Sequence, residues 1–436
     1  MIGHTLTSIP FAVKFLIVMA ATIGMSLIFT PIMTFVSKRI GAVDKPNKRR
    51  VNTKVMPSAG GLAIFLAFLI STTLLLPLIV HPQPIAIIQF HPLKVQIGTY
   101  LQYSWPFLLG AAVIVMTGLI DDIKELAPRW KMLGMVIASV MIWLFTHARF
   151  DNIKIPFGGP LIVFPAWLSL ILTVFWIVAI TNAVNLIDGL DGLASGVSII
   201  SLMTMGIVAL FFLPSLNVFL PIMIFTLAAA ILGFFPYNYH PAIIFLGDTG
   251  ALFLGFMISV FSLLGLKNAT AVAVLTPLLI LGVPLTDTVV AMIRRRLNQQ
   301  SISTADKMHL HHRLMALGFT HRGAVLVIYA IAAIFAFISL ILQVSGRLGG
   351  ILMVIASLIG LEIFFELLGV LGRGRQPILN ALRFVGNSDY RNKTLGREEE
   401  EVAESENEAE EDLDLDQTKE IPIPVRKSHG KRSDRN

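Results

Sequence analysis

The sequence contains no cysteine, so it offers neither a disulfide framework nor a cysteine-ligated metal site. Charged residues are also scarce: they make up 14% of the 436 residues, and only 13 aspartates and glutamates precede residue 398. By contrast, 55% of the residues are hydrophobic, and the mean hydropathy is +0.77. Such a composition lies far outside the range of soluble globular proteins. It excludes a soluble domain and predicts an integral membrane protein.

Long apolar runs recur along the chain. A helix needs about 20 residues to cross roughly 30 Å of hydrocarbon, and eleven runs approach that length. The sequence therefore predicts an all-α, polytopic membrane protein with about eleven transmembrane helices. No basic segment precedes the first run and no cleavage site follows it, so we expect a retained helix. The runs lie near residues 11–36, 58–80, 105–120, 131–147, 161–181, 193–213, 217–235, 249–265, 271–293, 323–343 and 348–371.

The lysines and arginines of the short loops predict the orientation. Loops that follow odd-numbered runs hold sixteen of them, whereas the opposite side holds about six. Because cytoplasmic loops carry the excess of positive charge, we expect the N-terminus outside and the C-terminus in the cytoplasm. Membrane lipids are thus predicted partners, and the scattered basic residues give no sign of nucleic-acid binding.

The end of the chain differs from the rest in composition. Residues 398–416 contain 12 acidic side chains and almost nothing that could form a core. Such a run is expected to stay solvated and disordered, and the arginines just before it are expected to face anionic lipid headgroups. The sequence thus predicts a transmembrane domain over 1–372 and a basic-then-acidic disordered tail over 373–436.

Four polar blocks follow the third, fifth, seventh and ninth runs. Their sequences are LIDDIKEL, NAVNLIDGLDGLASG, FPYNYHPAIIFLGDTG and MHLHHRL. All four are predicted to lie on the cytoplasmic side, and the opposite loops hold nothing comparable. The sequence therefore predicts one site, at the cytoplasmic face, that combines carboxylates, amides and imidazoles.

Some of these acids also have structural explanations. Asp191 and Asp248 precede apolar runs, where an aspartate can cap a helix N-terminus. Asp121 and Asp122 are harder to explain in this way, because they end a helix, where the macrodipole disfavours negative charge. Asp287 lies within the ninth run and is expected to pair locally, two turns before Arg294, or to support packing.

The block around residue 185 has polar residues three positions apart. Asn182, Asn185 and Asp188 would be neighbours on a helix, but Gly189 and Gly192 suggest that the row breaks into a loop. Such a loop would aim side chains at one point. We therefore favour a ligand site over a simple polar boundary.

Five aspartates in these blocks suggest a cation. Like charges brought close together raise each other's pKa values unless a cation neutralises them, and oxygen ligands without cysteine favour Mg2+, with Mn2+ as the alternative. A zinc site made of the three histidines of MHLHHRL is a further option, but their spacing does not match helical zinc motifs. Because Lys307 and Arg313 flank them, that loop is better suited to anions.

Carboxylates, a hard metal and a basic loop beside a membrane indicate phosphoryl transfer to a lipid. The four blocks, in this order, resemble the signature blocks of the polyprenyl-phosphate N-acetylhexosamine-1-phosphate transferases. The resemblance covers roughly residues 11–371. It implies a bacterial plasma-membrane enzyme with a cytoplasmic active site that transfers a sugar 1-phosphate from a UDP-sugar to undecaprenyl phosphate, with Mg2+, and releases UMP.

The resemblance also implies roles for individual residues. Asp121 and Asp122 match a pair assigned to the lipid phosphate, and whether one acts as a base or as a nucleophile stays open. Asp188 and Asp191 match acids of the active-site loop, which completes the set of expected catalytic residues. Asp248 and Asn185 are the expected metal ligands. The expected substrate-binding residues are Lys54, Asn185, Asn238, Phe245, His309, His311, His312 and Arg313.

The histidine block also bears on the substrate. A histidine, an aliphatic residue, two histidines and an arginine resemble the branch that uses UDP-N-acetylglucosamine, as in the first step of wall teichoic acid synthesis. An alternative is the phospho-N-acetylmuramoyl-pentapeptide transferase of peptidoglycan synthesis, and a secondary transporter is the alternative from another class. Ala251 departs from the family pattern, in which serine commonly follows GDTG. The sequence does not reveal the oligomeric state, and a homodimer is one option.

Overall fold

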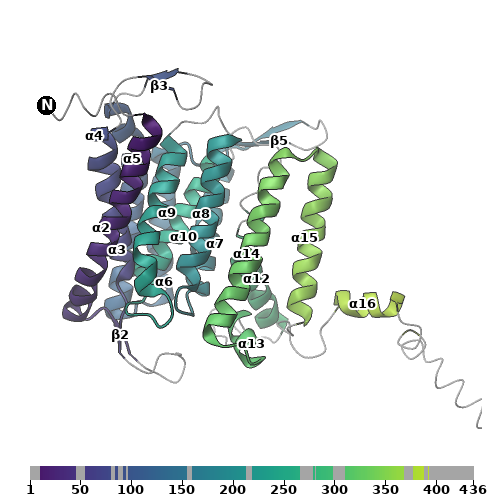
Figure 1. Cartoon of the computed structure of the whole chain (residues 1–436). Helices are drawn as coiled ribbons and strands as arrows, with labels where there is room; N and C mark the ends of the chain where they lie inside the picture. Colours follow the sequence, from purple (N-terminus) through teal and green to yellow (C-terminus); the bar gives the residue numbers. More distant parts are fainter. Residues whose placement is uncertain are drawn as a thin grey trace, which may run out of the picture. The chain divides into compact units, whose positions relative to one another are not determined.

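A computed structural model describes residues 10–45, 55–79, 84–86, 92–94, 97–154, 160–212, 219–265, 278–279, 281–297, 310–367, 377–386 and 391. The chain divides into two compact units, residues 1–373 and 374–436, which are considered separately. In the first unit, the described residues form almost entirely helices that lie side by side (Figure 1). The predicted all-α class is therefore confirmed.

Nine helices of the described residues are long and apolar enough to cross a membrane. Each overlaps one of the predicted runs, which confirms a multi-pass membrane protein, while the count of eleven stays a prediction. The nine are α2 (Phe11–Ile40), α5 (Ile97–Lys124), α6 (Pro128–Phe145), α7 (Ala166–Ile187), α8 (Leu193–Phe211), α9 (Phe219–Asn238), α10 (Gly247–Gly265), α14 (His321–Val344) and α15 (Arg347–Leu367).

The two remaining runs correspond to shorter helices. The run predicted over 58–80 contains α3 (Gly60–Ile70), the π-helical turn η1 (Ser71–Leu75) and α4 (Leu76–Ile79) in direct succession. Within the run predicted over 271–293, the structure describes chiefly α12 (Gly282–Leu297), which ends in three arginines. The next described helix is the short α13 (Leu310–Ala316).

Three small antiparallel hairpins lie in the loops. Figure 1 places β2 and α13 at one end of the helices, and β3 and β5 at the other. The C-terminus of α5 and the N-terminus of α6 lie at the same end as β2. The pairs are β1 (Val43–Asp44) with β2 (Met56–Pro57), β3 (Pro84–Ala86) with β4 (Pro92–Lys94), and β5 (Asn152–Lys154) with β6 (Leu161–Val163).

Helix α7 continues further than its apolar run. The loop predicted from Gly189 and Gly192 begins after Ile187, and Asn182 still lies within the helix, where its side chain donates a hydrogen bond to the carbonyl of Val178, one turn back, at 2.9 Å. The helix therefore remains regular to Ile187, and Asp188 is its C-cap residue. As a result, Asn185 projects from a regular helix instead of a loop.

Helix α10 is the most deeply buried span, and small residues let its neighbours approach it closely. A Cβ atom on Gly61 of α3 would lie only 2.1 Å from Cα of Gly250, and one on Gly118 of α5 only 2.5 Å from Cα of Thr249. Small residues permit such close helix packing in membrane proteins. The start of α10, which carries Asp248, is therefore held between α3 and α5.

The second unit contains α16 (Pro377–Gly386). A helix here corrects the expected disorder for these ten residues. The polar residues Asn380 and Arg383 lie three positions apart among apolar ones, which favours an amphipathic helix. Leu382 and Val385 are exposed. The acidic run over 398–416 lies outside the described residues.

Candidate active site

The carboxylate of Asp122 holds the first turn of α10. Its Oδ1 accepts the backbone N–H of Asp248 at 3.0 Å, and its Oδ2 accepts the backbone N–H of Thr249 at 2.9 Å and the Thr249 hydroxyl at 2.5 Å. A carboxylate at this place satisfies free N–H groups and opposes the positive end of the helix dipole. Gly247 precedes it with φ +72°, and any Cβ there would meet the carbonyl of Ser58. This turn fixes the position of Asp248.

Lys131 of α6 links two further acids. Its Nζ lies 2.5 Å from Oδ2 of Asp121 and 2.9 Å from Oδ1 of Asp248. The same Oδ1 of Asp248 accepts a hydrogen bond from Nδ2 of Asn185 at 2.5 Å. Asp121 is buried, whereas the Asp248 side chain remains 31% exposed. Four helices, α5, α6, α7 and α10, thus contribute to one polar cluster that is open to its surroundings at Asp248.

Asp188 faces other acids without a counter-charge. Among the residues that the structure describes, no hydrogen-bond donor or cation is paired with its carboxylate. Burial, together with the negative charges of Asp248, Asp122 and Asp191, raises the pKa of Asp188 well above its usual range. A cation beside this carboxylate would offset the repulsion that raises the pKa of Asp188.

The donor groups around Asp188 suit a hard divalent ion. Asp188 and Asp248 supply carboxylate oxygens, and Asn185 keeps its amide oxygen available because its Nδ2 is the atom bound to Asp248. Oxygen ligands of this kind, without thiolates or imidazoles, are typical of Mg2+ sites. The unpaired Asp188 carboxylate therefore supports the prediction of a magnesium site, although the ion itself stays a prediction.

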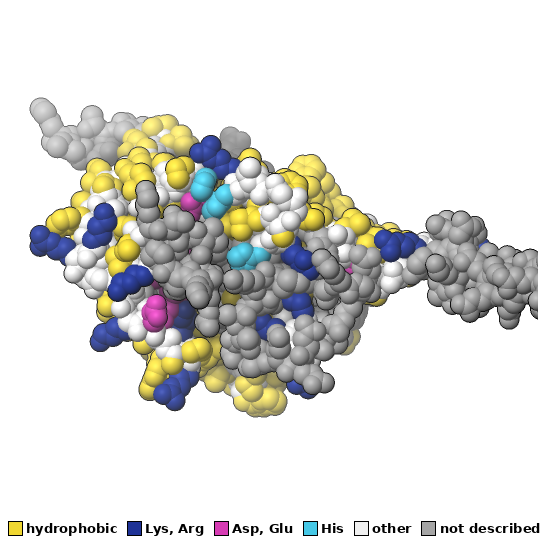
Figure 2. Space-filling model, turned by 90° about the horizontal axis from the view of Figure 1, so that it is seen from below, with side chains coloured by type: hydrophobic (Ala, Val, Ile, Leu, Met, Phe, Trp, Pro, Cys, Tyr) yellow, Lys and Arg dark blue, Asp and Glu magenta, His cyan; other side chains and the backbone are white. Residues whose placement is uncertain are grey.

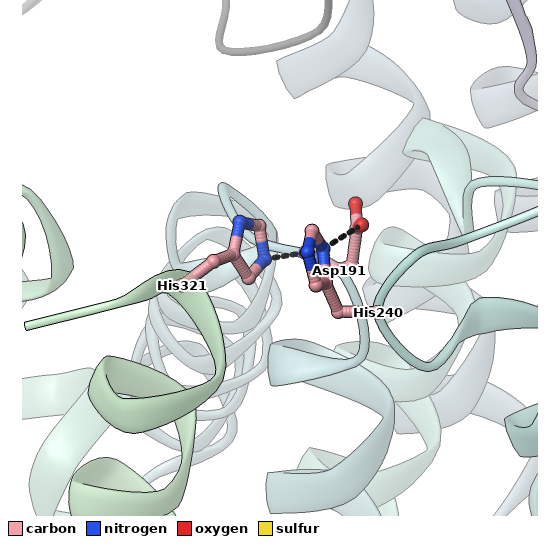
Figure 3. Close-up of side chains that lie close together, drawn as sticks. All are labelled: Asp191, His240 and His321. Atoms are coloured by element: carbon pink, nitrogen blue, oxygen red, sulfur yellow. Dashed lines mark hydrogen bonds and ion pairs between the residues drawn. The ribbon is translucent and has the colours of Figure 1, made fainter.

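Asp191 lies in the loop before α8, but it does not cap that helix. The N-cap residue is Gly192, and no side chain caps the helix. The Asp191 Oδ2 instead accepts hydrogen bonds from Nδ1 of His240 at 2.7 Å and from the backbone N–H of Ala242 at 3.1 Å. The ring of His321 lies beside them (Figure 3), and the ligating atoms of the three side chains fall within 4.8 Å of one another.

Asn238 and Phe245 match family positions that are expected to contact the uracil of the donor. Asn238 is the last residue of α9, and Phe245 lies on the segment between α9 and α10. Asn238 is only 2% exposed, and its amide accepts from the Ser195 hydroxyl at 2.7 Å and donates to the Ile244 carbonyl at 3.1 Å. Phe245 is half-buried, and its backbone N–H donates to the carbonyl of Pro57 at 2.8 Å. The hydrogen bonds of Asn238 thus hold the segment between α9 and α10 in place. The contacts of Asn238 and Phe245 with uracil stay predictions.

The short helix α13 carries part of the histidine block. The backbone N–H of Leu310 donates to Oδ1 of the buried Asp287 at 2.9 Å, so α12 fixes the start of α13. His312 and Arg313 are half-buried on this helix. Lys54 and His309 lie outside the described residues, and of His311 only the backbone is described.

The end of the molecule that carries this site is rich in basic side chains. Figure 2 views the protein from the end of β2 and α13, and it shows lysines and arginines spread around the face with histidines closer to its middle. Positive charge around an acidic cluster attracts anionic ligands while leaving room for a cation. The face is therefore suited to a phosphate-bearing substrate.

The structure brings most of the expected acids together, and it adds residues that the sequence analysis missed. Asp121, Asp122, Asp188 and Asp248 form one cluster, with Asp191 in the adjoining loop. Lys131 was counted only as a charge that indicates orientation, while His240 and His321 were given no role. The sequence signal for His240 was its place in the NYHPA block, whereas His321 had none.

Comparison with known proteins identifies relatives over most of the chain. Residues 104–266 match glycosyl transferase family 4. The chain is 39% identical over 353 residues to a probable undecaprenyl-phosphate N-acetylglucosaminyl 1-phosphate transferase of Bacillus subtilis, which covers 80% of this chain and 91% of the relative.

Two other relatives are more distant. The chain is 34% identical over 327 residues to a decaprenyl-phosphate N-acetylglucosaminephosphotransferase of Mycobacterium leprae, covering 71% of this chain and 78% of that protein. It is 27% identical over 327 residues to an undecaprenyl-phosphate alpha-N-acetylglucosaminyl 1-phosphate transferase of Escherichia coli K12, covering 73% and 82%. The chain therefore belongs to the polyprenyl-phosphate N-acetylhexosamine-1-phosphate transferases of glycosyl transferase family 4, and it is an enzyme that transfers sugar phosphates.

Proposed function

We propose that this enzyme transfers N-acetylglucosamine 1-phosphate from UDP-N-acetylglucosamine to undecaprenyl phosphate and releases UMP. The observation that carries the proposal is the cluster in which Lys131 joins Asp121 to Asp248 beside Asp188, whose carboxylate has no partner among the described residues. The names of the relatives from three bacteria specify N-acetylglucosamine and a polyprenyl phosphate. The order of the histidine block favours the same sugar over a muramoyl-pentapeptide.

The reaction is a displacement at phosphorus. An oxygen of the lipid phosphate attacks the phosphorus that bears the sugar, the bond to the bridging oxygen breaks, and UMP leaves with that oxygen. A phosphate monoester has a second pKa of about 6, so the acceptor is already largely dianionic at neutral pH and no strong base is needed. The enzyme's task is to position two anions and to neutralise their repulsion.

The side chains of the cluster divide this task. The ammonium group of Lys131 donates to phosphate oxygens. Its two carboxylate partners, Asp121 and Asp248, hold this group at the cluster, where it can reach the phosphate oxygens. Asp121 orients Lys131, and Asp122 holds the first turn of α10 in place. Asp188, Asp248 and the amide oxygen of Asn185 would bind Mg2+, for which Mn2+ is the nearest substitute. Bound Mg2+ supplies positive charge that stabilises the diphosphate as it breaks.

The location of the site follows from the charge pattern. The basic loops predict that the end carrying the cluster faces the cytoplasm. The resemblance to the family implies that the membrane is the bacterial plasma membrane and that the product starts a cell-envelope polymer such as wall teichoic acid. Transporters usually bind their substrates near the middle of the bilayer. In the described part of this chain, the acidic cluster instead lies where helices α5, α7 and α10 end or begin, which favours an enzyme that works at the interface.

A substrate panel tests the proposal. The purified protein, given Mg2+, undecaprenyl phosphate and UDP-N-acetylglucosamine, is expected to release one UMP for each lipid-linked sugar phosphate formed. UDP-N-acetylmuramoyl-pentapeptide is expected to react at least about 100-fold more slowly, because a site built for one sugar leaves polar groups unpaired with another. Preference for the pentapeptide would contradict the assigned sugar. Substrate flux across proteoliposomes without UMP release would support a transporter instead.

A further inference from the structure

Three connecting segments meet at the side chains of Asp191, His240 and His321, here named the Asp–His–His cluster (Figure 3). Asp191 lies three residues after Asp188, in the loop between α7 and α8. His240 lies just beyond α9, on the segment that leads to Asp248. His321 is the first residue of α14, shortly after α13. Each segment thus also carries, or adjoins, residues expected to act on the substrate.

The hydrogen bonds of the cluster define its protonation. The backbone N–H of Asp191 donates to Nε2 of His321 at 3.0 Å, so this nitrogen carries no proton and His321 is neutral with its proton on Nδ1. Oδ2 of Asp191 accepts from Nδ1 of His240 and from the N–H of Ala242, so Nδ1 of His240 is the protonated nitrogen. Asp191 therefore uses its backbone and its carboxylate to bind two different segments.

The arrangement of the rings does not suit a metal ion. The imidazoles of His240 and His321 stack with centroids 4.1 Å apart and planes only 18° from parallel. Ring nitrogens ligate a metal with lone pairs that lie in the ring plane, and two nearly parallel stacked planes do not converge on one ion. In addition, Nε2 of His321 already accepts the Asp191 N–H. The geometry indicates instead that the three side chains hold their segments together through hydrogen bonds.

Helix α14 strengthens the same connections. The Tyr329 hydroxyl donates to the carbonyl of Gly192 at 2.5 Å, next to Asp191. Arg322, the residue that follows His321, donates from Nη2 to the carbonyl of His240 at 3.1 Å. One helix therefore holds both the Asp188–Gly192 loop and the segment before α10.

We propose that His240 and His321 are positioning residues of the transferase reaction, which hold Asp191 and thereby the Asp188 carboxylate at the acidic cluster. This inference rests on the proposed function. Asp188 needs such support because, within the described residues, its own side chain has no donor to fix it. Asp191 then acts through this support, as an acceptor of hydrogen bonds, and not on the reacting atoms.

The chemistry of Asp191 provides the sharpest test. Asparagine at this position keeps an oxygen that can accept from His240 and Ala242, whereas alanine removes it. Asp191→Asn is expected to keep at least about one tenth of the wild-type kcat, and Asp191→Ala to lose about 10- to 100-fold, the usual cost of losing a supporting hydrogen bond. Near-complete inactivity of Asp191→Asn, equal to that of Asp191→Ala, would overturn the proposal, because the negative charge itself would then be required.

The histidines offer a parallel comparison. His240→Asn keeps a donor near the place of Nδ1, and His321→Gln keeps an acceptor near the place of Nε2. Both are expected to stay within about threefold of the wild-type kcat, whereas His240→Ala and His321→Leu lose about 10- to 100-fold with KM for UDP-N-acetylglucosamine almost unchanged. His147→Ala is the matched control, because His147 is exposed beyond the far end of α6.

Further measurements separate the remaining outcomes. Thermal unfolding in detergent shows whether the alanine and leucine variants fold. If they do not, the Asp191→Asn, His240→Asn and His321→Gln variants decide the matter, and defects in all three would overturn the proposal. Zinc retained by the purified wild type at about one ion per chain, and lost from His240→Ala, would also overturn it. An inactive wild type would instead contradict the proposed function.

Discussion

Replacing Asp248 with asparagine is expected to lower the rate of UMP release by at least about 100-fold, the usual cost of removing one charge-stabilising group from an active site. Asparagine has nearly the same shape, and its oxygen can still accept from Lys131 and Asn185 as Oδ1 of Asp248 does. The variant therefore removes a negative charge from the proposed magnesium site with little change in packing. Initial rates of UMP release at saturating lipid and nucleotide sugar measure the effect.

The matched control is Asp151→Asn. The side chain of Asp151 is 45% exposed and pairs with Arg149 at 2.8 Å, next to β5 at the opposite end of the helices. Exposed ion pairs contribute little to stability, so this variant is expected to keep its full rate. An Asp248→Asn enzyme that folds and works as well as Asp151→Asn would show that the acidic cluster plays no part in the reaction.

Removal of divalent ions is expected to have an effect of similar size. Enzyme treated with EDTA and then freed of the chelator should retain less than about 1% of its rate, and Mg2+ should restore it because the carboxylates alone repel the diphosphate. Mn2+ should also restore the rate. Ca2+ should do so poorly, because it is larger and prefers six to eight ligands in flexible geometry.

A rate that does not depend on divalent ions would contradict this expectation. A rate that EDTA leaves unchanged, at pH 7 and over several turnovers, would mean that Lys131 and the basic residues neutralise the phosphates without a metal. In that case the unpaired Asp188 carboxylate would need another explanation. Titration of the metal-depleted enzyme with Mg2+ distinguishes the two outcomes.

The helices could largely be predicted because apolar run length is a local property of the sequence. Nine predicted runs coincide with long helices. The last turns of α7 could not be predicted from apolar run length, because Asn182 and Asn185 interrupt the apolar run before the helix ends at Ile187. Asn182 bonds to its own helix, and Asn185 reaches Asp248, 63 positions away. Run length also missed α16, because this helix has only ten residues and contains Asn380 and Arg383.

The acidic cluster was predicted from four blocks on one predicted side of the membrane, whereas its supporting residues were not. Lys131 lies 117 positions from Asp248, and His321 lies 130 positions from Asp191. The excess of basic residues in cytoplasmic loops already explains a lone lysine at the start of a membrane helix. A lone histidine gives no sequence signal. Only the packing of α6, α10 and α14 reveals what these side chains contact.

The central claim is that Asp188 and Asp248 hold a divalent ion against the diphosphate of the donor. Phosphorus NMR of UDP-N-acetylglucosamine bound to the enzyme with Mn2+, and without the lipid acceptor, tests it directly. The account predicts strong paramagnetic broadening of both phosphorus signals in the wild type and its loss in Asp188→Asn and Asp248→Asn. Broadening that persists unchanged in both variants would contradict the account, because the ion would then be held elsewhere.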